Sequence, residues 1–318
     1  MSDRQAAGAL PAYIDYPSVQ TLPGPIAFTG VRMSAFSLAA DLGTLQALCD
    51  RLIAAPSGGR VGFMALPSVI MSFTEFPHSV FVNFADRGVA TERELSFAIP
   101  GIFTRFDAVP IEIGFALFMP FLFLDNPVAL MTGRENYGFF KQTGQIGMPY
   151  DPGSPGFSAD VYGCARYSPT AQWGQQRLVT LRRVAEAAPG PALGLPWTDP
   201  MTAARNLAAA MQAGTDGATL APAAFADFIT GRLPQIFLKQ FRDISEPTRA
   251  CYQAITLAGY KVTKLNVSFE DRYAIDLKAL DSTPVAAALG LAPAKETGLG
   301  MRVEMDMQLE NGKVLWQA

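Results

Sequence analysis

The chain has 318 residues, of which 17% are charged and 49% are hydrophobic, and its formal net charge at pH 7 is −3. A slightly acidic chain without a run of basic residues lacks the charge needed to bind a nucleic-acid backbone or an anionic membrane surface, so the sequence predicts neither partner. The low charged fraction indicates that part of the surface is covered by partner subunits, which favours a homo-oligomer.

The first 24 residues are polar and contain proline, without the basic and then apolar segments of a secretory signal. We therefore expect a flexible segment over 1–24 and a cytoplasmic protein. The longest apolar stretch, 111–124, is interrupted by a glutamate, a glycine and a proline and is too short to span a bilayer. The three cysteines are far apart in sequence and favour free thiols over disulfides: Cys49, Cys164 and Cys251.

The predicted elements begin with a strand at 25–38 and a helix at 41–55, for which Asp41 is the expected N-cap. A Pro-Ser-Gly-Gly sequence at 56–59 then breaks the chain. From 60 to 124, short runs rich in Val, Ile and Phe alternate with Pro, Gly and Asp, which is typical of the strands of an antiparallel sandwich or barrel. Further strands are predicted at 159–166, 177–184, 235–241, 251–269 and 300–309.

The segment 185–232 differs from the rest because its pattern is helical. Asp199 is placed as an N-cap, Pro200 occupies the first helical position, and strong helix formers continue to Met211. A second short helix is predicted at 222–230, and the Ala/Pro/Gly-rich stretch 187–196 is the candidate linker. The sequence thus predicts one α+β, mainly antiparallel β domain over 25–318, with a helical insertion at about 185–232.

Lys141 is the first lysine of the chain and the leading candidate for catalysis. Two phenylalanines precede it, and the apolar stretch 111–124 lies shortly before them, so the local sequence predicts a partly desolvated amine. Burial disfavours the ammonium form of a lysine, and a neutral amine can condense with a ketone or aldehyde to a Schiff base. The alternative is a lysine whose stem packs on the rings while its head stays in water.

Other kinds of site are disfavoured by what accompanies the remaining residues. His78 is the single histidine and has no nearby cysteine, so it cannot form an ordinary zinc site or supply the base of a triad at a GxSxG serine. Neither GxGxxG nor GxxxxGK[ST] occurs in the chain. We therefore expect no metal and no nucleotide cofactor.

Four short motifs follow one another between 112 and 142. They are Glu-Ile-Gly at 112–114, Leu-Asp-Asn-Pro-Val-Ala at 124–129, Gly-Arg-Glu at 133–135 and Gly-Phe-Phe-Lys-Gln at 138–142. In order and spacing this segment resembles the acetoacetate decarboxylase superfamily, in which the lysine of the last motif forms the Schiff base. The resemblance implies a mainly antiparallel β cone or barrel with peripheral helices, often assembled as a homo-oligomer, and assigns the nucleophile to Lys141.

Several further residues are candidates for roles beside the lysine. Glu112 is the expected proton-transfer group, because a carboxyl in an apolar strand can carry a proton near neutrality. Its alternative role is a carboxylate bound to Arg134 or to the backbone. Arg32 is matched by the resemblance to the arginine near the substrate carboxylate, and Glu75 competes with Glu112 as a second carboxylate of the cleft.

The last motif departs from the family pattern, because Gln142 stands where the decarboxylases have a second lysine. Gln142 can bind a substrate carboxylate or carbinolamine hydroxyl without charge, or it can be an exposed amide. Tyr137 is a candidate proton donor or a packing residue. Arg134 and Glu135 are expected to form a buried ion pair that fixes the turn before the lysine.

The sequence therefore favours a Schiff-base lyase that acts on a small keto acid, by decarboxylation or by aldol condensation with dehydration. Two alternatives stay open. The first is a non-catalytic protein that binds an apolar small molecule inside the barrel, where the phenylalanines and methionines of 63–140 would line the interior. The second is a cyclase or dehydratase in which Lys141 only orients the substrate.

Overall fold

The computed structural model describes residues 11–15, 21–186, 231–293, 295–297 and 300–318. Within these residues the chain is mostly strand, with a few short helices, which confirms the predicted α+β, mainly antiparallel fold class. The predicted linker, the two helices predicted within the insertion and most of the N-terminal segment lie outside the described residues.

The strands are β1 (Ile26–Ala39), β2 (Val61–Ala65), β3 (Ser68–Phe81), β4 (Ala90–Arg105), β5 (Glu112–Leu124), β6 (Lys141–Gly147), β7 (Gly156–Gly163), β8 (Gly174–Ala185), β9 (Arg232–Arg242), β10 (Ala250–Phe269), β11 (Arg272–Leu277), β12 (Gly300–Leu309) and β13 (Lys313–Gln317). The helical elements are α1 (Leu42–Cys49), η1 (Asp50–Ala54), η2 (Val82–Arg87), α2 (Pro127–Thr132), η3 (Gly133–Tyr137) and α5 (Val285–Ala288). The predicted helix at 41–55 is observed as α1 continued by η1, and Asp41 caps it by accepting a hydrogen bond from the backbone N–H of Thr44 at 2.7 Å.

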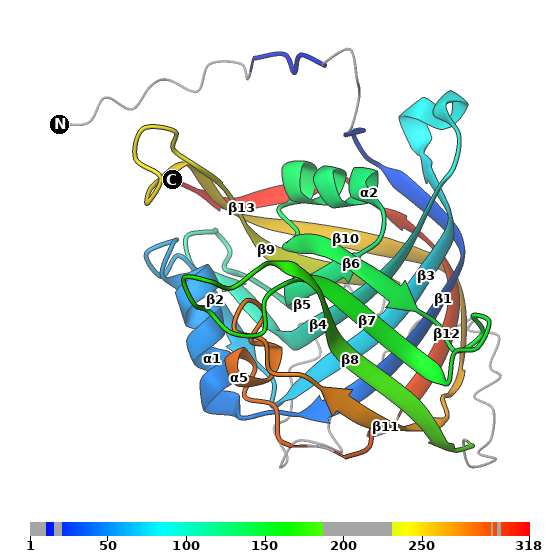
Figure 1. Cartoon of the computed structure of the whole chain (residues 1–318). Coiled ribbons are helices and arrows are strands. Elements are labelled where there is room, and N and C mark those ends of the chain that lie inside the picture. Colours follow the sequence, from blue (N-terminus) through cyan, green and yellow to red (C-terminus); the bar gives the residue numbers. More distant parts are fainter. Residues whose placement is uncertain (1–10, 16–20, 187–230, 294, 298–299) are drawn as a thin grey trace.

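Seven of the strands close into a ring (Figure 1). Antiparallel pairing connects β9, β10, β12, β1, β3, β4 and β5 in that order. A short parallel pairing between β5 and β9, at Leu117 with Gln235 and Phe118 with Ile236, completes the ring. A second layer formed by β6, β7, β8 and β11 crosses one outer face of the ring, starting from a parallel pairing of β6 with β5.

Two hydrophobic cores follow from this arrangement. One fills the ring and includes Phe28, Phe76, Leu122, Phe237 and Met305. The other lies between the ring and the second layer and includes Phe73, Phe97, Phe157, Leu181 and Tyr273. The strands β3, β4 and β5 contribute side chains to both cores. Because side chains alternate along a strand, both faces of these strands are buried, and their sequences therefore read as nearly continuous apolar runs.

None of the three cysteines is in a disulfide, and Cys49 and Cys164 are buried. No helix in the described part of the chain has both the length and the apolar character needed to cross a membrane. Three strands had no counterpart in the sequence-based prediction: β6, β11 and β13. The first of these begins with Lys141.

Candidate active site

The segment from β5 to β6 closes one end of the ring and places Lys141 there. Asn126 caps α2, because its side-chain oxygen accepts from the backbone N–H groups of Val128 and Ala129 at 2.9 and 3.1 Å. Its amide nitrogen donates to the carbonyl of Thr91 on β4 at 2.8 Å. The preceding residue, Asp125, accepts from the backbone N–H of Arg93 at 2.8 Å. The Asp-Asn-Pro sequence thus starts the helix and ties it to β4.

Two glycines let the backbone of η3 pass close to lysine side chains. A Cβ atom at Gly133 would lie 2.6 Å from Cδ and 2.8 Å from Cε of Lys141. Gly138 ends η3 with φ of +87°, and a Cβ there would lie 2.6 Å from Cβ of Lys239. The Gly-Arg-Glu motif therefore includes a glycine whose missing side chain makes room for Lys141.

Lys141 is buried, with a relative exposure of 6%. Its Nζ lies 3.6 Å from Oε2 of Glu92 and 3.9 Å from Oε2 of Glu94, and 5.6 Å from the ring centre of Phe139. Both glutamates belong to β4 and are buried on the same face, because they are two residues apart on a strand. The alternative in which the head of Lys141 stays in water therefore does not describe this site.

The pairing of β4, β5 and β6 explains why Lys141 lies close to the two glutamates. Leu122 of β5 pairs with Lys141 on one side and with Ser96 of β4 on the other. Lys141 and Ser96 therefore occupy one row across the sheet, and Glu94 lies one step along β4 on the same face. Glu92 follows one step further toward α2.

Burial is the main cause that raises the pKa of Glu94 to about 7; the charge of Lys141 opposes this shift and the charge of Glu92 adds to it. A carboxyl that is partly protonated near neutrality can donate and accept protons in a reaction. The site thus contains an amine and a matched acid–base group within 4 Å of each other.

A cavity of about 30 Å³ adjoins the lysine at this end of the ring. Its walls are mainly apolar, and its polar lining includes Ser79, Glu92, Tyr137 and Tyr260. The hydroxyls of Ser79 and Tyr137 and Oε2 of Glu92 are buried without a hydrogen-bond partner among the described residues. Burial raises the pKa of Tyr137 to about 12, so this phenol stays protonated at neutral pH. Buried polar atoms without partners are uncommon in native proteins, and here two such hydroxyls line one cavity beside Oε2 of Glu92, which faces the Lys141 amine at 3.6 Å.

Glu112 is not part of this site. It lies at the start of β5, opposite Arg105, and forms an ion pair with Lys313 of β13. Lys141 of β6 pairs with Leu122, which lies ten residues after Glu112 on β5. At the usual rise per residue, Glu112 and Leu122 are about 33 Å apart along the strand. The prediction that Glu112 transfers protons beside Lys141 is therefore wrong, and Glu92 and Glu94 occupy that position instead.

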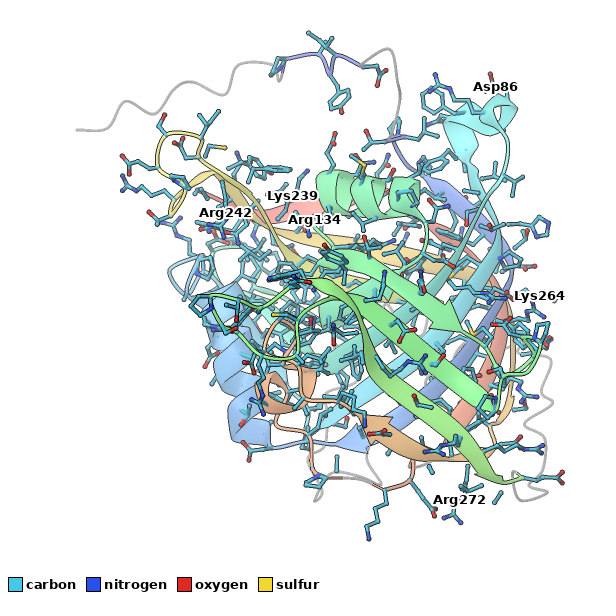
Figure 2. The ribbon with its side chains drawn as sticks, viewed as in Figure 1. Asp86, Arg134, Lys239, Arg242, Lys264 and Arg272 are labelled. Carbon is cyan, nitrogen blue, oxygen red and sulfur yellow. The ribbon has the colours of Figure 1, made fainter. Side chains whose placement is uncertain are left out.

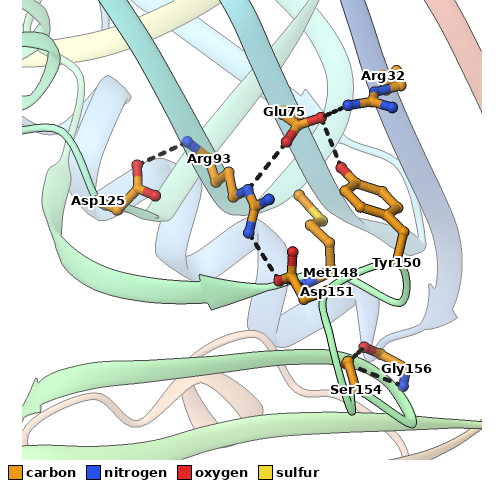
Figure 3. A network of polar contacts seen from close by, with 9 residues as sticks. All are labelled: Arg32, Glu75, Arg93, Asp125, Met148, Tyr150, Asp151, Ser154 and Gly156. Atoms are coloured by element: carbon orange, nitrogen blue, oxygen red, sulfur yellow. Dashed lines mark hydrogen bonds and ion pairs between the residues drawn. The ribbon is translucent and has the colours of Figure 1, made fainter.

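Arg32 and Glu75 form an ion pair away from the lysine (Figure 3). Glu75 also accepts from Tyr150 at 2.8 Å and from Arg93 at 3.1 Å, and Arg93 in turn contacts Asp151 at 2.8 Å. Because Arg93 lies between the two site glutamates on β4, its side chain points to the opposite face of the strand. Neither Arg32 nor Glu75 lines the cavity, so their predicted contact with substrate is not supported.

The remaining predicted residues are divided between the cavity and the surface. Tyr137 lines the cavity, whereas Gln142 is exposed on β6. Arg134 is exposed beside α2 (Figure 2) and donates to the carbonyl of Lys141 at 3.1 Å. Glu135 accepts from Tyr13 at 2.5 Å, so the expected buried ion pair between Arg134 and Glu135 is not formed.

Glu92 and Glu94 were missed by the sequence analysis. Their signal is the Thr-Glu-Arg-Glu-Leu sequence at 91–95, which places two carboxyls on one face of a strand that continues as an apolar run. No group of three or more His, Cys, Asp or Glu side chains that could hold a metal ion occurs within the described residues.

The chain has the acetoacetate decarboxylase-like fold. An acetoacetate decarboxylase from Legionella pneumophila matches with a TM-score of 0.55 and 15% identity, over 98% of this chain and 93% of that one. The enduracididine biosynthesis enzyme MppR, complexed with the condensation product of pyruvate and imidazole 4-carboxaldehyde, matches with a TM-score of 0.52 and 15% identity over 98% of both chains.

An acetoacetate decarboxylase-like enzyme from Sphingomonas wittichii RW1 matches with a TM-score of 0.52 and 16% identity, over 95% of this chain and 97% of that one. No protein-family model and no curated protein sequence matches the chain. The resemblance inferred from the four motifs is thus confirmed at the level of the fold.

Proposed function

We propose that the protein is a carbon–carbon lyase that forms a Schiff base between Lys141 and a carbonyl substrate. The observation that carries this proposal is the burial of the Lys141 amine 3.6 and 3.9 Å from two buried carboxyl oxygens, at the edge of a cavity. Buried ion clusters seldom stabilise a protein more than well-packed apolar residues would, so such a cluster points to chemistry. The enzymes with this fold, a decarboxylase and an enzyme found with a pyruvate condensation product, support the same reaction class.

The reaction starts when a proton passes from the ammonium group to Glu92 or Glu94, which leaves a neutral amine next to a carboxylic acid. The amine attacks the carbonyl carbon, and the acid protonates the oxygen so that water can leave. The resulting iminium withdraws electrons from a bond at the neighbouring carbon. That bond breaks by loss of CO2 in a β-keto acid, or by loss of a proton before an aldol condensation and dehydration.

The surroundings of the lysine suit this sequence of steps. The apolar walls of the cavity, including Phe28 and Phe139, limit the access of water to the imine. Glu94, whose pKa is about 7, can return the proton to the product carbon. Lys141 and Glu92 place an amine and a carboxyl in the wall of the cavity, which disfavours the alternative of a non-catalytic protein that binds an apolar small molecule there.

Reduction with borohydride tests the proposal, because only an imine is converted to a stable secondary amine. We expect incubation with a small ketone or keto acid, followed by sodium borohydride, to add the mass of the reduced carbonyl compound at Lys141. Lys141→Met removes the adduct while keeping an apolar stem of similar length. Lys239→Met is the matched control, because burial lowers the pKa of Lys239, which lies outside the cavity. The absence of an adduct with every carbonyl compound, in a folded protein, would refute the proposal.

A further inference from the structure

The charge around Lys141 discriminates between possible carbonyl substrates. With all three groups ionised, Lys141, Glu92 and Glu94 carry a formal charge of −1 in a buried space. The group becomes neutral when Glu94 is protonated, which occurs near pH 7 because its pKa is raised to about 7. The carboxylate of a keto acid would therefore approach one or two buried carboxylates at short range, where little water screens the repulsion.

Cationic groups near the site are already engaged elsewhere. Arg93 points to the opposite face of β4 and contacts Glu75 and Asp151. Arg134 donates to the backbone carbonyl of Lys141. Among the described residues that line the cavity, Lys141 is the only cation, and the reaction converts its nitrogen to the imine. The cavity therefore offers a substrate carboxylate no ion-pair partner that is independent of catalysis.

Neutral hydrogen-bond donors are present instead. The hydroxyls of Ser79 and Tyr137 are buried, line the cavity and have no partner among the described residues. Tyr260 also lines the cavity, and burial, with added repulsion from Glu94 and Glu92, raises its pKa well above the usual range. The first two N–H groups of α2 that border the cavity are occupied by Asn126 and are not available to an anion. Such hydroxyls match an uncharged carbonyl or carbinolamine oxygen.

We infer, on the basis of the proposed function, that the site takes a short uncharged aldehyde or ketone in preference to the anion of a keto acid. The volume of about 30 Å³ limits the part that enters to a few non-hydrogen atoms. The enamine then arises when a proton is removed from the carbon next to the iminium, not when CO2 is lost.

The chemical steps balance without a further reagent. The Lys141 amine, the ketone and one proton from the carboxylic acid of Glu92 or Glu94 give an iminium and one water molecule. The carboxylate left behind then accepts the proton from the neighbouring carbon. The enamine carbon forms a bond to the carbonyl carbon of a second aldehyde, whose oxygen receives that proton. Water then hydrolyses the iminium, which releases the product ketone, restores the amine and returns one proton to the carboxylate. The cleavage of a β-hydroxy ketone is the reverse of the same sequence.

Pyruvate and methyl pyruvate provide a matched test, because they have the same ketone and differ in the charge of the neighbouring group. The rate of borohydride-trapped adduct formation at Lys141 is measured by intact mass for both compounds and for acetone, at pH 7.5. The same rates on N-acetyl-lysine correct for the greater intrinsic reactivity of the ester. We expect the corrected preference for methyl pyruvate over pyruvate to be at least tenfold, and to become smaller in Glu94→Gln.

The outcomes separate the two proposals. Adducts with pyruvate that form as fast as those with methyl pyruvate, after correction, would overturn the inference while leaving the Schiff-base function intact. No adduct with pyruvate, methyl pyruvate or acetone would remove the proposed function and the inference together. The decisive comparison uses the unaltered protein, so it does not depend on whether Glu94→Gln folds.

Discussion

Glu94 combines deep burial with a position 3.9 Å from an amine, and its pKa is raised to about 7, so that its protonation changes near neutrality. In the unfolded chain the same group is solvated and ionises at its ordinary value of 4.5. Between these two pH values the folded protein holds a proton that the unfolded chain has already lost. Protonation of one side chain is therefore linked both to stability and to the proposed reaction.

The first prediction concerns the pH dependence of stability. Because the pKa of Glu94 is raised from 4.5 to about 7 on folding, this group makes the free energy of unfolding decrease as pH rises between those values, by about 3 kcal/mol. Below 4.5 and well above 7 it contributes no slope. The free energy of unfolding, measured with denaturant, should decrease less from pH 5 to pH 8 in Glu94→Gln than in the unaltered protein. Glu112→Gln, far from the site, should keep the full difference; an unchanged difference in Glu94→Gln would contradict the assignment.

Gly133 shows why the short Gly-Arg-Glu motif is informative. A side chain at this position would meet the stem of Lys141 at 2.6 Å and the ring of Phe139 at 3.3 Å. The glycine is therefore explained by the space that the lysine requires, and its neighbour Arg134 binds the lysine carbonyl.

At the level of secondary structure, α2 and η3 form a short connection that crosses the open end of the ring and leads into β6. The N-cap residue Asn126 serves two elements, since its oxygen caps α2 and its amide nitrogen contacts β4 at Thr91. Thr91 immediately precedes Glu92. Helix capping and the position of a site carboxyl thus depend on one side chain.

The second prediction is that Asn126→Ala lowers the free energy of unfolding by about 1–2 kcal/mol, as the loss of an N-cap usually does. We also expect a several-fold slower formation of the Lys141 adduct, because α2 loses its contact with β4 beside Glu92. The matched control is Asp41→Ala, which removes the N-cap of α1 outside the cavity. That variant should lose similar stability and retain the adduct rate. Equal adduct rates in both variants would show that the contact with Thr91 has no role in the site.

Across the whole molecule, the ring and the second layer are connected by the polar network of Arg32, Glu75, Arg93, Tyr150 and Asp151 (Figure 3). The network joins β1, β3 and β4 of the ring to the loop between β6 and β7. Burial alone would raise the pKa of Glu75, but the hydrogen bonds from Tyr150, Arg32 and Arg93 outweigh it and lower that pKa. Glu75 therefore stabilises the folded state in its ionised form.

The third prediction follows from the lowered pKa of Glu75. Because the pKa of Glu75 is lowered on folding, its stabilisation is present above its ordinary value of 4.5 and is lost as pH falls through the folded value. We expect Glu75→Gln to lower the free energy of unfolding at pH 7 by about 2 kcal/mol, between the usual values for exposed and buried pairs. The free energy of unfolding should fall less between pH 7 and pH 3 in Glu75→Gln than in the unaltered protein.

Two comparisons make this test specific. Glu296→Gln breaks a more exposed pair with Arg272 and should change stability by less than about 0.5 kcal/mol. The rate of adduct formation at Lys141 should be unchanged in Glu75→Gln, because Glu75 is outside the cavity. A slower rate would restore the substrate-binding role that the sequence suggested for Arg32 and Glu75. The homo-oligomer, inferred from the low charged fraction, and the cytoplasmic location, inferred from the N-terminal sequence, stay predictions.

The strands with clear apolar patterns were predictable from sequence, and the predicted strand at 300–309 has the bounds of β12. In contrast, β6 has the polar and glycine-rich sequence Lys-Gln-Thr-Gly-Gln-Ile-Gly and carries no local strand signal. It forms because β5 and β7 supply backbone partners on its two sides. Tertiary pairing overrides weak local propensity in such a case.

The amino-acid sequence by itself determined the mainly antiparallel fold class and the choice of Lys141 as the candidate nucleophile, because strand periodicity and an apolar lysine environment are local properties. Only the tertiary structure decided which carboxyls face the amine. Glu112 and Lys141 are close in the motif order, but Glu112 begins the long strand β5, whereas Lys141 of β6 pairs with β5 near its other end. Glu92 and Glu94 are about fifty residues before the lysine and reach it because β4, β5 and β6 pair side by side. Proximity across a sheet depends on strand register, which local sequence does not encode.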